Sequence, residues 1–173
     1  MSVKVIRPCE SHDELSRLKI FLAGPIQGAP DWQALAIEKL TGLLEKDGDD
    51  YLIVSPRSIE SERNFGFEDQ VLWETQNLQL ADVILFFFFN EEKHYCDRAY
   101  AQTTRFELGE HFSDACKFSS RKLIVGFDNR FTGTNYIKER VKIAKTKNSR
   151  DNIKLCDGLE EAVQATVELV QSR

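Results

Sequence analysis

The sequence predicts an α/β protein, a doubly wound sandwich with a five-stranded parallel sheet. Three observations support this fold. Short apolar segments alternate along the chain with longer segments of helical periodicity. The most apolar segment, residues 83–89, has no polar alternation, which is typical of a strand buried on both faces of a parallel sheet. The 173 residues are 42% hydrophobic and include twelve Phe, so we expect one core and a single domain over residues 1–173.

Five segments have the length and composition of buried strands. They are residues 19–24, 51–54, 83–89, 122–126 and 153–156. The first is closed by Gly24-Pro25 and the second by Ser55-Pro56, both of which are turn signals. Residues 1–18 are polar and charged, and we expect them to form an N-terminal extension.

Helical spacing of apolar residues predicts a helix between successive strands. The first helix follows Asp31, a candidate N-cap, and includes Trp32 and the leucines after it. The others are expected over residues 67–81, 104–115, 136–145 and 159–171. Because parallel strands need crossover connections, this alternation indicates a flavodoxin-like sheet with helices on both faces.

Composition excludes several classes of function. The formal net charge is -5, so no overall positive field recruits nucleic acid or an anionic membrane. Lysines and arginines gather over residues 138–154, but Tyr136 is the one aromatic residue near them, which favours a solvated surface over a nucleic-acid patch. The apolar run 83–89 is too short to span a bilayer, and the polar N-terminus is unlike a secretory signal. We therefore expect a cytoplasmic location, with a nuclear one as the alternative.

The four cysteines, Cys9, Cys96, Cys116 and Cys156, are far apart and form no CxxC pair. This pattern predicts reduced thiols of a cytosolic protein. His94 and Cys96 lie close together, but structural zinc normally takes four ligands, so we expect no metal.

In a doubly wound sheet the ligand crevice lies beyond the carboxyl ends of the strands. The loop from Gly24 to Gly28 follows the first strand, and its glycines would let backbone N–H groups approach a sugar or phosphate. A purely structural turn explains this loop equally well. Asp31 is either a helix cap or a ligand contact, and Arg57 either binds a phosphate or pairs with a surface acid.

Two carboxylates, Glu74 and Glu107, are predicted to reach one pocket beside the strand at residues 83–89. Paired carboxylates suit chemistry at a glycosidic carbon. Glu107 has two interpretations. Thr104-x-x-Glu107 fits a capping box, in which the Glu folds back onto the helix start. Alternatively, Glu107 is a nucleophile, kept ionised by the helix dipole, that attacks the anomeric carbon of a sugar.

Three segments, in this order over residues 19–126, resemble the nucleoside 2-deoxyribosyltransferase-like family, which includes relatives that hydrolyse the N-glycosidic bond of nucleoside monophosphates. The segments are Ile20-Phe21-Leu22-Ala23-Gly24-Pro25, Trp73-Glu74 with Leu80-Ala81-Asp82-Val83-Ile84-Leu85-Phe86, and Phe106-Glu107-Leu108-Gly109-Glu110.

The resemblance implies a role for each of these segments. Glu107 would be the nucleophile, and Glu74, where the transferases typically carry Asp, would bind or protonate the base. Gly24 and Pro25 would lie against the sugar. The resemblance also implies a homo-oligomer whose neighbouring subunit contributes an Asn near the 5′ end of the sugar, and Asn135 lies at about the right distance after Glu107.

We therefore expect an enzyme, either a nucleoside deoxyribosyltransferase or a nucleoside or nucleotide N-glycosidase. No metal or organic cofactor is needed, because a side chain can protonate the departing base. Contacts to the substrate are expected from Gly24, Pro25, Asp31, Trp32, Arg57, Asn90 and Asn135. The alternative is a non-catalytic nucleotide-binding module that senses a ligand and binds a partner protein, because fold alone does not decide function.

The segment 90–103 departs from the transferase pattern, because it is longer and contains Asp97 without a clear alignment. Loops of this length are often lids or binding loops. We expect either a lid that closes over the base, with Tyr95 or Tyr100 stacking on it, or a surface insertion.

Overall fold

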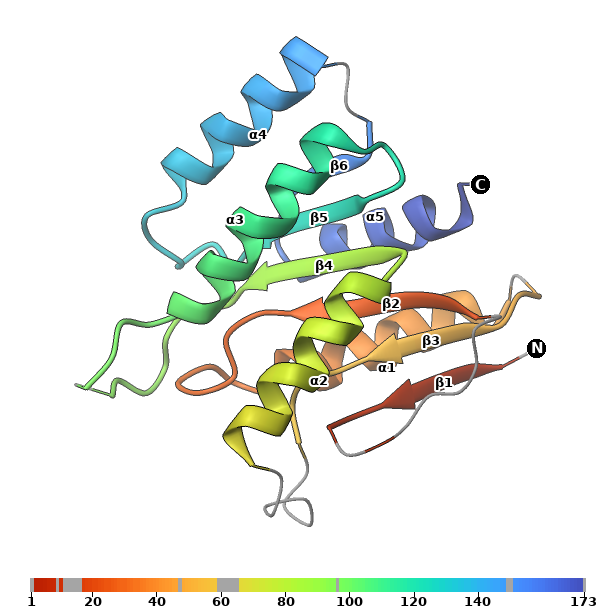
Figure 1. Cartoon of the computed structure of the whole chain (residues 1–173), viewed down its shortest axis with the longest axis horizontal. Helices are drawn as coiled ribbons and strands as arrows, with labels where there is room; N and C mark the ends of the chain where they lie inside the picture. The colour runs from red at the N-terminus through yellow and green to blue at the C-terminus, as the bar shows by residue number, and fades with distance from the viewer. Residues whose placement is uncertain are drawn as a thin grey trace.

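The computed structural model describes residues 2–8, 10, 17–46, 48–58, 66–95, 97–148 and 151–172. Strands and helices alternate along the chain (Figure 1). The strands are β1 Val3–Ile6, β2 Leu18–Ala23, β3 Tyr51–Val54, β4 Val83–Phe88, β5 Lys122–Phe127 and β6 Ile153–Asp157. The helices are α1 Trp32–Leu44, α2 Phe67–Leu80, α3 Gln102–Lys117, α4 Asn135–Asn148 and α5 Leu159–Gln171. The predicted doubly wound α/β fold is confirmed.

All strand pairs in the sheet are parallel, and the strand order is β1-β3-β2-β4-β5-β6. After β2 the chain moves to one side to form β3, and then crosses to the other side of β2 to form β4. The order therefore reverses between β2 and β4. This switch point is where ligands bind in open parallel sheets.

The sheet has six strands where the sequence analysis predicts five. The additional strand, β1, lies within the predicted N-terminal extension and pairs with β3, from Val3 opposite Tyr51 to Ile6 opposite Val54. Its Lys4 is exposed, while Val3 and Val5 are only partly buried. An edge strand of four residues with one charged position is too short and too polar for its periodicity to be recognised.

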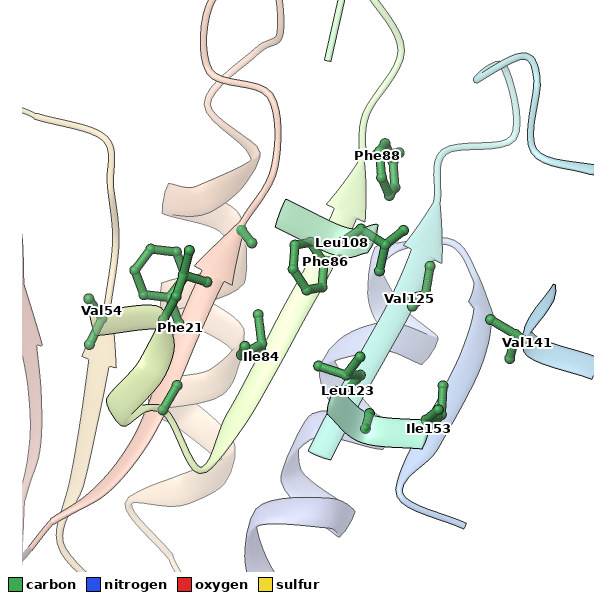
Figure 2. Close-up of a cluster of buried hydrophobic side chains, with 14 of the residues drawn as sticks. Phe21, Val54, Ile84, Phe86, Phe88, Leu108, Leu123, Val125, Val141 and Ile153 are labelled. Atoms are coloured by element: carbon green, nitrogen blue, oxygen red, sulfur yellow. The ribbon is translucent and has the colours of Figure 1, made fainter. Parts of the chain in front are cut away.

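Helices cover both faces of the sheet (Figure 1). One face packs against α1 and α5, and the opposite face packs against α2, α3 and α4. Strand β4 is buried on both faces, as predicted, with every residue at most 1% exposed. Its Ile84, Phe86 and Phe88 belong to the cluster under α2, α3 and α4, part of which Figure 2 shows. Leu108 of α3 belongs to the same cluster and brings the neighbouring Glu107 close to the end of the sheet.

Candidate active site

A cavity of about 570 Å³ lies at the switch point, beyond the carboxyl ends of β2 and β4. This volume is in the range of small-molecule sites. Three parts of the chain form most of its wall: the loop after β2, the first turns of α2, and the segment that leads into α3. The lining residues are Phe21, Ala23, Gly24, Pro25, Ile26, Gln27, Pro56, Phe67, Gln70, Val71, Glu74, Arg98, Ala99, Ala101, Gln102, Thr103, Thr104 and Glu107.

The cavity brings together Glu74 from α2 and Glu107 from α3, as the sequence predicts. Burial raises the pKa of Glu107 to about 8, and repulsion from Glu74 and then from Glu110 contributes to this rise. Burial also raises the pKa of Glu74, against the effect of a hydrogen bond that Gln70 Nε2 donates to its Oε1 at 2.7 Å. Two carboxyls that repel each other in a poorly solvated site do not ionise independently, so the pair favours a state with one proton.

The capping-box interpretation of Glu107 is wrong. Helix α3 begins at Gln102, two residues before the predicted start, and its N-cap is Ala101, which makes no side-chain capping bond. Thr104 therefore lies inside the first turn, and Glu107 lies one turn further along. The helix dipole acts mainly within the first turn. Burial thus decides the pKa of Glu107, and its direction is opposite to the one predicted from a helix start.

Ala101 itself adopts a left-handed conformation, with φ of 56°, and lines the cavity. Among the described residues, no other non-glycine residue has a positive φ. Such a conformation is uncommon for alanine and is held in place by surrounding structure. It turns the chain from the loop after β4 into α3, and so sets the direction from which Glu107 reaches the cavity.

The loop after β2 needs glycine at position 24. A Cβ on Gly24 would lie 2.4 Å from the carbonyl oxygen of Phe87 and 2.4 Å from Cζ2 of Trp32. Trp32 is fully buried, and its Nε1 donates to the carbonyl oxygen of Pro25 at 3.0 Å. The structure therefore places Gly24 and Pro25 on the cavity wall and Trp32 beneath them in the core.

Gly24→Ala is expected to destabilise the protein by about 1–3 kcal/mol, because the added methyl overpacks a site bounded by backbone. Gly42→Ala is the matched control: a Cβ on Gly42, in α1, has open space, and alanine is the better helix former by up to about 1 kcal/mol. Urea unfolding of both variants measures the difference. A Gly24→Ala variant as stable as the wild type would contradict the close contact at this loop.

The remaining predicted site residues do not line the cavity. Asp31 is the N-cap of α1, as predicted: its Oδ1 accepts a hydrogen bond from the Ala34 N–H at 3.0 Å. Arg57 is directed at Asp31 and at the loop after β2. Asn90 donates to the carbonyl oxygen of Glu91, and Asn135 begins α4 as an exposed residue after β5. Substrate contacts by these residues stay predictions.

The loop after β4 is docked on the loop after β2. The N–H groups of Glu92 and Lys93 both donate to the carbonyl oxygen of Gly28, at 2.8 and 3.1 Å. The Tyr100 hydroxyl donates to the carbonyl oxygen of Phe89, and Tyr95 packs near the Lys93 ammonium. Neither tyrosine lines the cavity, so the arrangement does not provide the predicted stacking on a base.

Sequence reasoning did not identify several residues of the cavity wall. They include Gln70 and Phe67 on α2, and Arg98, Ala99 and Ala101 before α3. For Gln70 a usable signal existed, because it lies four residues before Glu74 and so on the same helix face. For Arg98 and Ala101 no local pattern was available, because their position follows from the docking of one loop on another.

Cys116 and Cys156 are free thiols, as predicted, whereas Cys9 and Cys96 lie outside the described residues. In the part of the chain that the structure describes, no three His, Cys, Asp or Glu side chains gather where they could hold a metal ion. Within that same part, none of the helices has the length and apolar character that crossing a membrane requires.

The stability of the protein should fall as pH rises from about 5 to about 8. The folded state raises the pKa of Glu107 from 4.5 to about 8, so in this window folded Glu107 keeps a proton that the unfolded chain has lost. Below this window both states are protonated and the penalty is absent. Glu107→Gln removes the group, and should therefore stabilise the protein by about 2–5 kcal/mol at pH 8.5 but by less than about 1 kcal/mol at pH 5.

Urea unfolding of the wild type and of Glu107→Gln at the two pH values measures this effect. Comparing the variant with the wild type cancels the titration of the groups that do not interact with Glu107. An equal difference at both pH values would show that Glu107 titrates normally in the folded protein.

In doubly wound α/β folds, a cavity at the switch point is the place where small-molecule ligands bind. The family model described as nucleoside 2-deoxyribosyltransferase like matches residues 17–119. This is more than half of the 173 residues, and the chain belongs to that family. No curated protein matches the chain. Every residue that lines the cavity falls within the matched segment, which also contains β2, β4 and the two glutamates.

Proposed function

We propose that the protein transfers or hydrolyses the N-glycosidic bond of a nucleoside or nucleoside monophosphate. The observation that carries this proposal is the pairing of Glu74 and Glu107 in one cavity, within the segment that matches the family. The raised pKa values of both groups support it, because a shared proton provides an acid and a nucleophile in the same site.

In the reactive form the single proton of the pair lies on Glu74, and in the first step Glu107 acts as an ionised carboxylate and attacks the anomeric carbon. The bond between that carbon and the base breaks, its electron pair stays on the base, and Glu74 gives its proton to the base. The product is a sugar held on Glu107 as an ester, and Glu74 is now ionised.

In the second step water or a second base attacks the anomeric carbon. The ester bond to Glu107 breaks, its electron pair returns to the carboxylate, and the attacking group gives its proton to Glu74. Both glutamates then have their starting charges, so the cycle is balanced and draws on no cofactor.

The test is incubation with a panel of nucleosides and their monophosphates, with and without a second free base, followed by chromatography for released or exchanged base. A 2-fluoro sugar analogue should leave its mass on the peptide that contains Glu107, because the fluorine slows the second step. Binding without any release of base, across the whole panel, would contradict the proposal and favour the non-catalytic module.

We also propose that the protein is a homo-oligomer. Two large apolar side chains are exposed near the paired carboxyls: Phe67 of α2, which lines the cavity, is 81% exposed, and Phe106 of α3, next to Glu107, is 75% exposed. Exposed apolar groups gathered beside a site are typical of an interaction surface.

Phe67→Asp is therefore expected to lower the molar mass in light scattering, whereas Ile143→Asp, on the exposed side of α4, should leave it unchanged. A wild-type protein that stays monomeric at micromolar concentration would contradict this proposal.

A further inference from the structure

Arg57 follows β3 and lies behind the cavity wall. We infer that Arg57 is a positioning residue, which holds the loop over residues 24–31 in the shape that forms one wall of the cavity. Its role is therefore different from the phosphate contact that the sequence left open. The consequence for catalysis rests on the proposed function, whereas the effect on the loop does not.

Among the described residues, the guanidinium makes four polar contacts, and each is to this loop or to the first turn of α1. Nη2 donates to the carbonyl oxygens of Pro30 at 2.9 Å and Ile26 at 3.3 Å. Nε donates to Oε1 of Gln33 at 3.1 Å and lies 3.2 Å from Oδ1 of Asp31. The side chain is 22% exposed, and Gln33 is fully buried.

This geometry suits arginine and no other side chain. A planar guanidinium presents several donors in a fixed fork, so one group can hold acceptors on both sides of a turn. Burial lowers the pKa of Arg57, and Asp31 opposes that effect. Asp31 therefore helps to keep Arg57 charged. Both Nε and Nη2 of Arg57 already donate to acceptors within the protein.

The loop that Arg57 holds is also bonded to the segment before α3, which forms another wall of the cavity. Gly28, in the same loop, accepts hydrogen bonds from Glu92 and Lys93, and the Gln27 carbonyl oxygen accepts one from Arg98 at 3.0 Å. A Cβ on Gly28 would lie 2.8 Å from the carbonyl oxygen of Lys93, so the two loops are in close contact. Loosening residues 24–31 should therefore also loosen the segment that leads into α3.

The test compares Arg57→Met and Arg57→Lys with the wild type. Methionine keeps length and packing but removes every donor, whereas lysine keeps the charge near Asp31 and loses the fork. Arg130→Met is the control, because Arg130 also pairs with an aspartate, Asp128, and lies 4.0 Å from Glu92, but makes no direct contact with residues 24–31 within the described part of the chain. Amide hydrogen exchange of the peptides over residues 24–31 and 159–171 is measured for each protein, together with KM and kcat for a nucleoside and for its monophosphate.

In Arg57→Met, exchange in residues 24–31 should rise by about tenfold or more, as expected when hydrogen bonds from a charged donor are lost, with α5 unchanged. KM should rise by a similar factor for the nucleoside and the monophosphate alike, with a smaller change in kcat. Arg57→Lys should recover part of both effects.

Unchanged exchange would overturn the inference. So would a KM that rises for the monophosphate alone, since that result would make Arg57 a phosphate ligand. If the wild type turns over no nucleoside at all, the proposed function fails, and the exchange measurement still decides the role of Arg57. Should Arg57→Met not fold, the comparison of Arg57→Lys with Arg130→Met decides it by the same two measurements.

Discussion

Glu107→Gln is expected to lower kcat by about 10³-fold or more while the protein still folds and binds nucleoside. The amide has nearly the same shape as the carboxyl but cannot attack an anomeric carbon. Because Glu107 lies on the cavity wall and not at the helix start, the substitution removes no capping bond from α3. Chromatography of the released base measures the rate, and calorimetry measures binding.

The control for this substitution is Glu38→Gln, an exposed carboxylate on α1, on the other face of the sheet. It should keep wild-type turnover. A Glu107→Gln variant that releases base within tenfold of the wild-type rate would remove Glu107 from the role of nucleophile, whatever the behaviour of the control.

Glu74→Gln is expected to lower the rate on natural nucleosides by about a hundredfold, the usual effect of losing a general acid. The loss should be much smaller for a substrate whose leaving group is activated, because such a group departs without a proton. Glu68→Gln, an exposed carboxylate in the first turn of the same helix, is the matched control and should have little effect on either substrate.

The pH profile offers a second measurement on the same variant. In the wild type the pair loses its one proton near pH 8, and kcat/KM should fall as pH rises through this value, because Glu74 can then no longer protonate the base. Glu74→Gln removes both the proton donor and the charge that raises the pKa of Glu107, so this falling limb should disappear, and the activity that remains should rise with pH as Glu107 ionises at a lower pH. Equal losses on both substrates together with an unmoved limb would show that Glu74 has a structural role and is not the acid.

The elements of the fold could be predicted because the patterns that produce them are local. The run at residues 83–89 is apolar at every position, and β4 is buried on both faces. Asp31 could be identified as a cap because a cap bonds to a residue three positions away. The pairing of Glu74 and Glu107 followed from a simple rule, that the carboxyl ends of parallel strands meet at one edge.

Where the placement of a strand or side chain depends on contacts between distant segments, the sequence alone did not predict it. Strand β1 exists because β3 offers a free edge, and its own four residues carry little pattern. Trp32 fits the periodicity of a helix, but only the packing of α1 shows that its indole supports the Gly24-Pro25 turn from beneath. No local pattern in the sequence assigns a partner to Arg57, and the four contacts that it makes with described residues are to a segment more than twenty positions earlier in the chain.

By itself, then, the sequence determined the alternation of strands and helices, the doubly wound architecture and the two glutamates of the candidate site, because periodicity and strand polarity need no knowledge of distant neighbours. Tertiary structure alone decided the protonation of those glutamates and the shape of the cavity around them. The pKa of Glu107 is raised by burial and by the neighbouring charge of Glu74, 33 residues earlier in the chain. Desolvation and charge repulsion depend on distances in space, and these exist only after the chain has folded.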